Sequence, residues 1–141
     1  MIQRIQTLWL LFAAACGFVM TKVSLFSATL PDNSIRELIA TESLLLFAIV
    51  MVVAFMAMTT IFFFKNRPLQ LRLTIIGIIA SIGIIALEVY GIEQFKTTNA
   101  ITSGTYQFGG LLPIFMLIFF FLAARGIRRD QKLVKSLDRL R

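Results

Sequence analysis

A long uncharged segment constrains this chain more than any other feature. From Ser43 to Phe64 the sequence contains no charged residue, and about 20 mostly apolar residues suffice for a helix to cross a hydrocarbon core of roughly 30 Å. Three further segments, 5–26, 73–90 and 108–124, are nearly as apolar. Because these runs are continuous rather than alternating, they are typical of helices and not of barrel strands. The sequence therefore predicts an all-α fold, an integral membrane four-helix bundle with spans at 5–26, 43–64, 73–90 and 108–124.

The composition agrees with a membrane protein and offers little for catalysis. Only 15% of the residues are charged and 58% are hydrophobic, whereas soluble domains carry about 25% charged residues. The chain has no histidine and one cysteine, which excludes an intrachain disulfide and any multi-cysteine metal site. No nucleophile stands beside a base, and the spans contain no polar cluster. We therefore expect no enzymatic activity, no catalytic or metal-binding residues, and no cofactor.

The single cysteine, Cys16, allows two interpretations of the first apolar segment. It could mark the cleavage region of a bacterial lipoprotein signal, or it could lie within an uncleaved helix. A lipoprotein signal ends its apolar core before the cysteine and continues into a polar tether. Here Gly17–Met20 carry the apolar run onward, and the position three before the cysteine is Ala13. We expect an uncleaved helix, with Cys16 as a small residue in a helix interface.

The basic residues fall unevenly on the two sides of the predicted spans. If the N-terminus is cytoplasmic, all 14 basic residues except Lys22, Arg36 and Lys96 lie on the inner side. The inner residues are Arg4, Lys65, Arg67, Arg72, Arg125, Arg128, Arg129, Lys132, Lys135, Arg139 and Arg141. Cytoplasmic loops of membrane proteins carry an excess of lysine and arginine. This distribution predicts a multi-pass protein with both termini in the cytoplasm.

The C-terminal segment 127–141 is predicted to form a basic amphipathic helix after the four-span domain at 1–126. At 100° per residue, the apolar side chains share one face: Ile127, Leu133, Val134, Leu137 and Leu140. The opposite face carries Arg128, Lys132, Lys135 and Arg139, with Arg129 at its edge. Such a helix lies along an anionic leaflet or docks on a protein partner. Nucleic acid is the least favoured partner, because no aromatic residues are interleaved for base stacking.

Two ionisable residues, Lys22 and Glu88, lie within the apolar spans. Both stand roughly 9–10 Å beyond the middle of their helices at 1.5 Å per residue, on the outer side. A charge inside the membrane is a candidate functional site, so one hypothesis is a Lys22–Glu88 pair that is structural or part of an ion path. In the alternative, Lys22 extends to the outer headgroups and Glu88 already lies at the interface.

Short patterns predict packing faces and one helix start. Ala13 and Gly17 form a small-xxx-small pair that lets another helix approach closely. Three small residues of the third span are predicted to form a second packing face: Gly77, Ser81 and Gly83. Ser34 with Glu37 three residues later is a capping-box pattern. This pattern predicts that the second helix begins near Ile35, outside the membrane.

Several motifs resemble those of one bacterial family. They are residues 1–7 (MIQRIQT), 64–70 (FKNRPLQ), the Leu112–Pro113 pair, 123–130 (AARGIRRD) and 133–141 (LVKSLDRLR). The family consists of small four-span membrane proteins from Bacteroidota and is catalogued as domain of unknown function 4293. The resemblance covers essentially the whole chain. It implies four spans in a bacterial inner membrane, but it implies no activity.

The sequence is compatible with two functions. The first is a non-catalytic structural or accessory subunit whose basic cytoplasmic face engages anionic lipid or a larger membrane protein complex. That face comprises Lys65, Arg67, Arg72, Arg125, Arg128, Arg129, Lys132, Lys135 and Arg139. The second is a small channel or transporter that acts as a homo-oligomer and uses Lys22 and Glu88.

Overall fold

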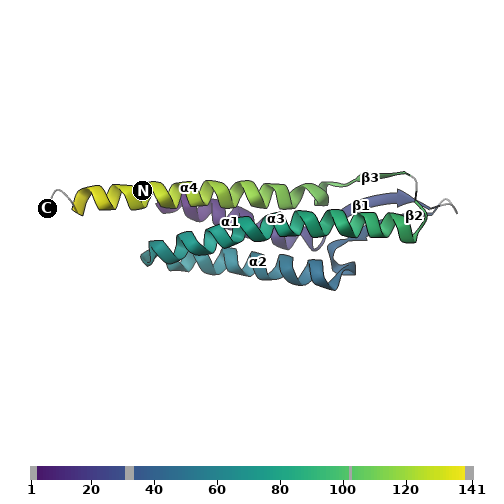
Figure 1. Cartoon of the computed structure of the whole chain (residues 1–141), viewed down its shortest axis with the longest axis horizontal. Helices are drawn as coiled ribbons and strands as arrows, with labels where there is room; N and C mark the ends of the chain where they lie inside the picture. Colours follow the sequence, from purple (N-terminus) through teal and green to yellow (C-terminus); the bar gives the residue numbers. More distant parts are fainter. Residues whose placement is uncertain (1–2, 31–33, 102, 139–141) are drawn as a thin grey trace.

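The computed structural model describes residues 3–30, 34–101 and 103–138. Within these ranges the chain forms four α-helices: α1 (Gln3–Met20), α2 (Leu44–Phe62), α3 (Arg67–Thr98) and α4 (Leu112–Asp138). The helices run alongside one another in an elongated bundle, and a small sheet extends one end (Figure 1). α1 packs on α2 and α4, and α3 also packs on α2 and α4. The four predicted helices are confirmed, and they pack as a bundle.

Three helical segments in the described part are long and apolar enough to cross a membrane. They are Leu44–Lys65, Arg67–Thr98 and Phe108–Val134. The apolar part of α1, Ile5–Met20, is shorter and measures roughly 24 Å at 1.5 Å per residue. α3 extends past both ends of the predicted span 73–90. α1 is thus shorter than its predicted span, and α3 is longer than its predicted span.

The turn between α2 and α3 follows directly from its sequence. A 3-10 turn, Phe63–Lys65, leads from one helix to Asn66. The Asn66 side chain caps α3, because its Oδ1 accepts a hydrogen bond from the Leu69 amide at 3.4 Å. Pro68 stands in the first turn of α3. The N–H groups of a first turn have no acceptor within the helix, so the absence of an N–H on proline costs no hydrogen bond there. The two helices therefore run antiparallel with a minimal connection.

Three short antiparallel strands form the sheet at the opposite end of the bundle. They are β1 (Ser24–Thr29), β2 (Ile35–Ile39) and β3 (Gly104–Tyr106), in the spatial order β2-β1-β3. β1 pairs with β2 from Ser24 opposite Ile39 to Thr29 opposite Ile35, with a register shift near the start. β3 pairs with the middle of β1. The sheet thus ties the loop after α1 to the loop after α3.

The prediction that the first helix continues to Phe26 is wrong. α1 ends at Met20, where the amide of Lys22 bonds the Val19 carbonyl at 2.9 Å in a turn. Leu25 and Phe26, which the prediction gave to this helix, are fully buried as part of β1. Pairing with two partner strands, one of them distant in the sequence, supplies backbone hydrogen bonds that local hydrophobicity does not reveal.

The predicted helix start at Ile35 is also wrong. Residues 35–39 form β2, and a 3-10 turn, Ala40–Glu42, separates this strand from α2. The helix is capped instead by Ser43, whose Oγ accepts a hydrogen bond from the Leu46 amide at 3.4 Å. The capping-box pattern does not start a helix here, because β1 lies beside these residues and its backbone groups form hydrogen bonds with them.

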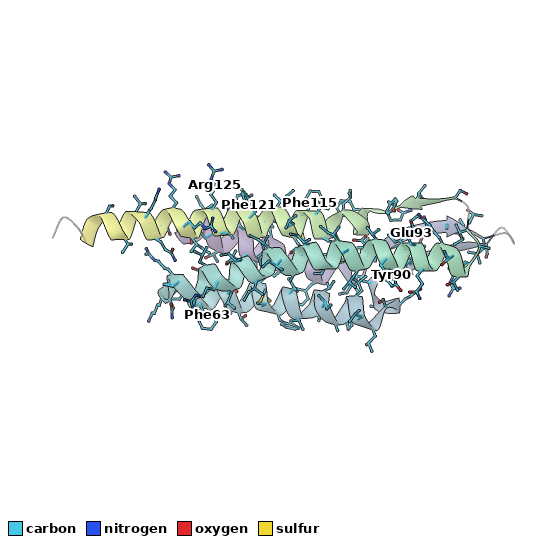
Figure 2. The ribbon with its side chains drawn as sticks, in the orientation of Figure 1. Phe63, Tyr90, Glu93, Phe115, Phe121 and Arg125 are labelled. Carbon is cyan, nitrogen blue, oxygen red and sulfur yellow. The ribbon has the colours of Figure 1, made fainter. Side chains whose placement is uncertain are left out.

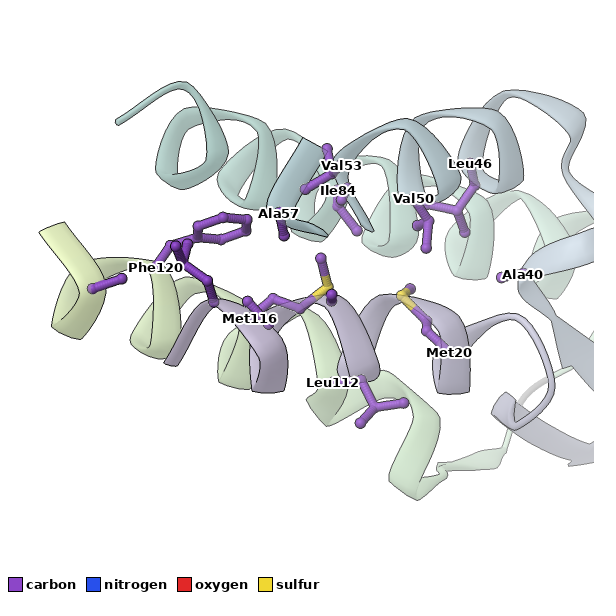
Figure 3. Close-up of a cluster of buried hydrophobic side chains, with 14 of the residues drawn as sticks. Met20, Ala40, Leu46, Val50, Val53, Ala57, Ile84, Leu112, Met116 and Phe120 are labelled. Atoms are coloured by element: carbon purple, nitrogen blue, oxygen red, sulfur yellow. The ribbon is translucent and has the colours of Figure 1, made fainter. Parts of the chain in front are cut away.

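The bundle interior is a continuous apolar core with contributions from all four helices (Figure 3). Leu10, Val50, Ile84, Met116 and Phe120 are fully buried near its centre. A second, smaller cluster joins the sheet to the end of α3 and consists of Phe26, Ala28, Ile92 and Phe95. The core therefore runs from the helical bundle into the sheet.

Glycines define two of the helix contacts. A Cβ on Gly17 would lie 2.8 Å from the Ala54 Cβ, so the small-residue pair predicted on α1 does bring α2 close. A Cβ on Gly77 would lie 2.5 Å from Cε1 of Phe120, which packs its ring on that glycine. The prediction for Gly83 is wrong, because this residue is exposed and a Cβ there would meet nothing within 4 Å. Ser81, by contrast, is fully buried.

Candidate functional site

The basic residues gather at the end of the bundle opposite the sheet. The α2–α3 turn, the start of α1 and the last turns of α4 all lie there (Figure 1). We call this region the basic end, and it comprises Lys65, Arg67, Arg72, Arg125, Arg128, Arg129 and Lys132. Arg139 lies outside the described residues, as does the side chain of Lys135. The fold thus brings together basic residues from two distant parts of the sequence.

Most of these side chains point away from the bundle. Arg67 is partly buried, and the others are exposed: Lys65, Arg72, Arg125, Arg128, Arg129 and Lys132. Phe115, Phe121 and Arg125 follow one another along α4, so its apolar surface passes directly into its basic surface (Figure 2). α4 is unbroken from Leu112 to Asp138, and this part of the predicted tail therefore continues the fourth helix without a bend.

A surface hollow of about 650 Å³ on α4 is lined almost entirely by basic side chains. Its lining consists of Arg125, Arg128, Arg129, Gln131 and Lys132. Guanidinium groups present N–H donors in a fork that matches the oxygens of phosphate and carboxylate. The hollow can therefore hold an anionic group by charge and by directed hydrogen bonds.

A buried polar contact holds α4 against α1 beneath this surface. The Gln6 Nε2 donates to Oδ2 of Asp130 at 2.6 Å, and both side chains are buried. Nη1 of Arg67 donates to the Asp130 backbone carbonyl at 3.4 Å. Gly126 provides room for this contact, because a Cβ there would lie 2.8 Å from Cγ of Gln6. These bonds connect α1, α3 and α4 and fix the direction of the basic part of α4.

Sequence reasoning missed Gln6 and Asp130, although one signal was present. Asp130 stands three residues after Ile127 and four before Val134. It therefore occupies the apolar face of the helix, where an acidic side chain is buried only with a partner. Its partner is 124 residues away in the chain, and no local pattern identifies it.

Lys22 and Glu88 occupy different surroundings. Lys22 is exposed in the turn after α1, whereas Glu88 on α3 is 4% exposed. The ion pair found among the described residues joins Lys96 to Glu93 at 2.9 Å and includes neither of them. Glu88 instead lines a cavity of about 460 Å³ near the sheet. Among the described residues Lys22 and Glu88 thus form no ion pair with each other, and Glu88 is more buried than an interface position implies.

The fold and the basic end define a helical bundle of the kind that membranes accommodate, with apolar helices and a charged surface at one end. A family model described as Domain of unknown function (DUF4293) matches residues 2–140, and the chain belongs to this family. No curated protein matches the chain, and no solved structure matches it.

Proposed function

We propose that this protein is a non-catalytic, multi-pass subunit of a bacterial inner membrane whose basic end binds the headgroups of anionic phospholipids. The observation that carries the proposal is the position of the basic hollow on α4. Its charges begin at Arg125, one turn after Phe121, which is the last exposed large apolar side chain of α4 before them; Leu133 and Val134 are exposed farther along the helix. In a membrane, the point on α4 where the basic residues begin would lie at the depth of the lipid phosphates.

The exposed apolar surface supports the membrane placement. Large apolar side chains in the middle of the bundle face outward, with Val52 66% exposed, Ile79 64% and Phe121 60%. Soluble proteins expose extended apolar patches only at interaction sites, whereas lipid tails cover such side chains in a bilayer. α1 is shorter than the other three helices. We propose that α1 also crosses the membrane, and that the turn after it and the sheet occupy the remaining outer part of the bilayer.

The charge distribution supports the orientation. Tyr90 and Tyr106 are exposed near the sheet, and Trp9 lies toward the basic end, as expected for aromatic side chains at the two interfaces. The excess of lysine and arginine at the basic end supports a cytoplasmic location for that end. The cytoplasmic leaflet also carries the anionic lipids that attract it.

The interior of the bundle favours a subunit over a pore formed by one copy of the chain. A second cavity of about 560 Å³ opens near the basic end and is lined by Gln6, Gln70 and Asp130 among others. It shares no lining residue with the cavity at Glu88. Between them the core is filled by fully buried apolar side chains such as Val50 and Met116. The channel alternative therefore requires an assembly of several copies.

The proposal predicts a preference for phosphatidylglycerol over phosphatidylcholine with identical acyl chains. The experiment titrates both lipids into purified full-length protein in non-ionic detergent and measures bound lipid by native mass spectrometry. The variant Arg128→Gln/Lys132→Gln should bind phosphatidylglycerol about 30-fold more weakly, because each basic residue near an anionic surface contributes about 1 kcal/mol. Binding of phosphatidylcholine should not change.

The matched control is Lys22→Gln/Lys96→Gln, which removes the same charge at the sheet end. This variant should retain the affinity of the wild type for phosphatidylglycerol. Equal affinity of the wild type for the two lipids would contradict the proposal, as would an equal loss in both double variants. A co-purified acidic protein that competes with the lipid would assign the basic end to a protein partner instead.

A further inference from the structure

The cavity near the sheet is apolar on most of its wall and opens toward the side of the bundle. It lies between the ends of α2 and α3 and the strands β1 and β2, and it has a volume of about 460 Å³. Leu45, which is exposed, and Tyr90 both line it. An elongated apolar group that enters the cavity can therefore continue along the outer surface of α2.

Glu88 provides a carboxyl group at the buried side of this cavity. The side chain is 4% exposed, and no hydrogen bond or ion pair joins it to any part of the chain that the structure describes. Gly110 packs closely against the Glu88 carboxyl group, since a Cβ on Gly110 would lie 2.9 Å from Oε1 of Glu88. Among the described residues no fully buried side-chain oxygen or nitrogen lacks a hydrogen-bond partner, so the Glu88 oxygens are still accessible from the cavity that this residue lines. In such largely apolar surroundings a carboxylate without a partner is costly. A cationic hydrogen-bond donor in the cavity would remove that cost.

Arg36 provides the opposite charge at the mouth of the same cavity. Its guanidinium carbon lies 5.9 Å from the centroid of the Phe95 ring, and Nη1 donates to Oδ1 of Asn99 at 3.4 Å. These contacts hold the guanidinium in place while most of its five N–H donors are left for another acceptor. The cavity thus has a carboxyl group inside, a cationic group at its mouth and apolar walls. Glu42 also lines it but is exposed to water.

We propose that this cavity binds a phospholipid with a primary-ammonium headgroup, namely phosphatidylethanolamine. The ammonium reaches Glu88 and donates hydrogen bonds to its carboxylate, the phosphate lies against Arg36, and the acyl chains pass over Leu45 to the surface of α2. Phosphatidylcholine carries the same charges but its quaternary ammonium has no N–H to donate. Phosphatidylglycerol has no cation for Glu88. The binding rests on the membrane placement proposed above, but it involves the opposite end of the molecule from the basic end.

The test compares phosphatidylethanolamine with phosphatidylcholine of identical acyl chains, titrated into full-length protein in non-ionic detergent. Wild-type protein should bind phosphatidylethanolamine about tenfold more tightly, as expected for one charge-assisted hydrogen bond that only the primary ammonium makes. Glu88→Gln should abolish this preference. The matched control is Glu93→Gln, an acidic residue on the same helix that is exposed and lies outside the cavity; it should keep the preference. Arg36→Gln should weaken both lipids equally, because both carry the phosphate.

Equal binding of the two lipids by wild-type protein would overturn the proposal without any variant. A preference that survives in Glu88→Gln would also overturn it. Soluble phosphoethanolamine that binds as tightly as the lipid would show a headgroup site for a small molecule and overturn the lipid assignment. Phosphatidylglycerol binding, measured in the same samples, separates the two proposals, because Glu88→Gln leaves the basic end unchanged and Arg128→Gln/Lys132→Gln leaves this cavity unchanged.

Discussion

Replacing Gly77 with leucine is expected to destabilise the bundle by about 3 kcal/mol, in the upper range for overpacking a well-filled core. A Cβ at this position would lie 2.5, 2.7 and 2.8 Å from three atoms of the Phe120 ring. Phe120 is itself fully buried and belongs to the main core cluster. The ring therefore has little room to retreat, and α3 and α4 must separate. Equilibrium unfolding in mixed micelles measures the loss.

The matched control is Gly83→Leu on the same helix. A Cβ on Gly83 would meet nothing within 4 Å, and leucine has a higher helix propensity than glycine by roughly 1 kcal/mol. This variant should be as stable as the wild type or more so. Phe120→Ala introduced into Gly77→Leu should recover part of the loss, because the two side chains compete for the same space. Equal effects of the two glycine variants would contradict the packing described for α3 and α4.

Asp130→Leu is expected to cost about 3 kcal/mol of unfolding free energy, because it removes a hydrogen bond to a carboxylate and leaves a buried amide unpaired. The amide belongs to Gln6, which donates to Asp130 at 2.6 Å. Losing the contact also frees the end of α4 from α1. The same unfolding measurement in mixed micelles reports the effect.

A double-mutant cycle separates the bond from the bulk of the side chains. Gln6→Leu/Asp130→Leu removes both polar groups, and replacing both partners by apolar groups of similar shape is close to neutral. The double variant should therefore be more stable than Asp130→Leu alone. If the two single losses simply add, Gln6 and Asp130 are not coupled, and the contact does not hold α4 in place.

The four helices were predictable because their signal is local. A continuous apolar run needs no partner to be recognised, and the uncharged segment at 43–64 corresponds closely to α2 (Leu44–Phe62). The Asn66–Arg67–Pro68 turn carries its own capping chemistry. The small residues Ala13 and Gly17 likewise predicted a close helix contact, and the packing of Gly17 on Ala54 confirms it.

The sheet and the buried polar groups were not predictable, because they depend on residues far apart in the chain. β1 pairs with β3 about 80 positions later, as Phe26 opposite Tyr106 shows, so its residues were assigned to the first helix. The partner of Asp130 is equally remote. Glu88 was recognised as a charge within a span, but its burial beside Gly110 and the cavity around it arise only from the tertiary fold.

Cysteine labelling measures directly whether the basic end faces the cytoplasm and the sheet faces outward, as we propose. Cys16 is first replaced by alanine, and single cysteines are then introduced as Thr29→Cys, Thr105→Cys and Ser136→Cys, all at exposed positions. Spheroplasts of a bacterial host producing each variant are treated with a membrane-impermeant maleimide before and after permeabilisation. We expect the cysteines at 29 and 105 to react in intact spheroplasts and the cysteine at 136 to react only after permeabilisation. Labelling of position 136 from outside, or protection of positions 29 and 105, would contradict it.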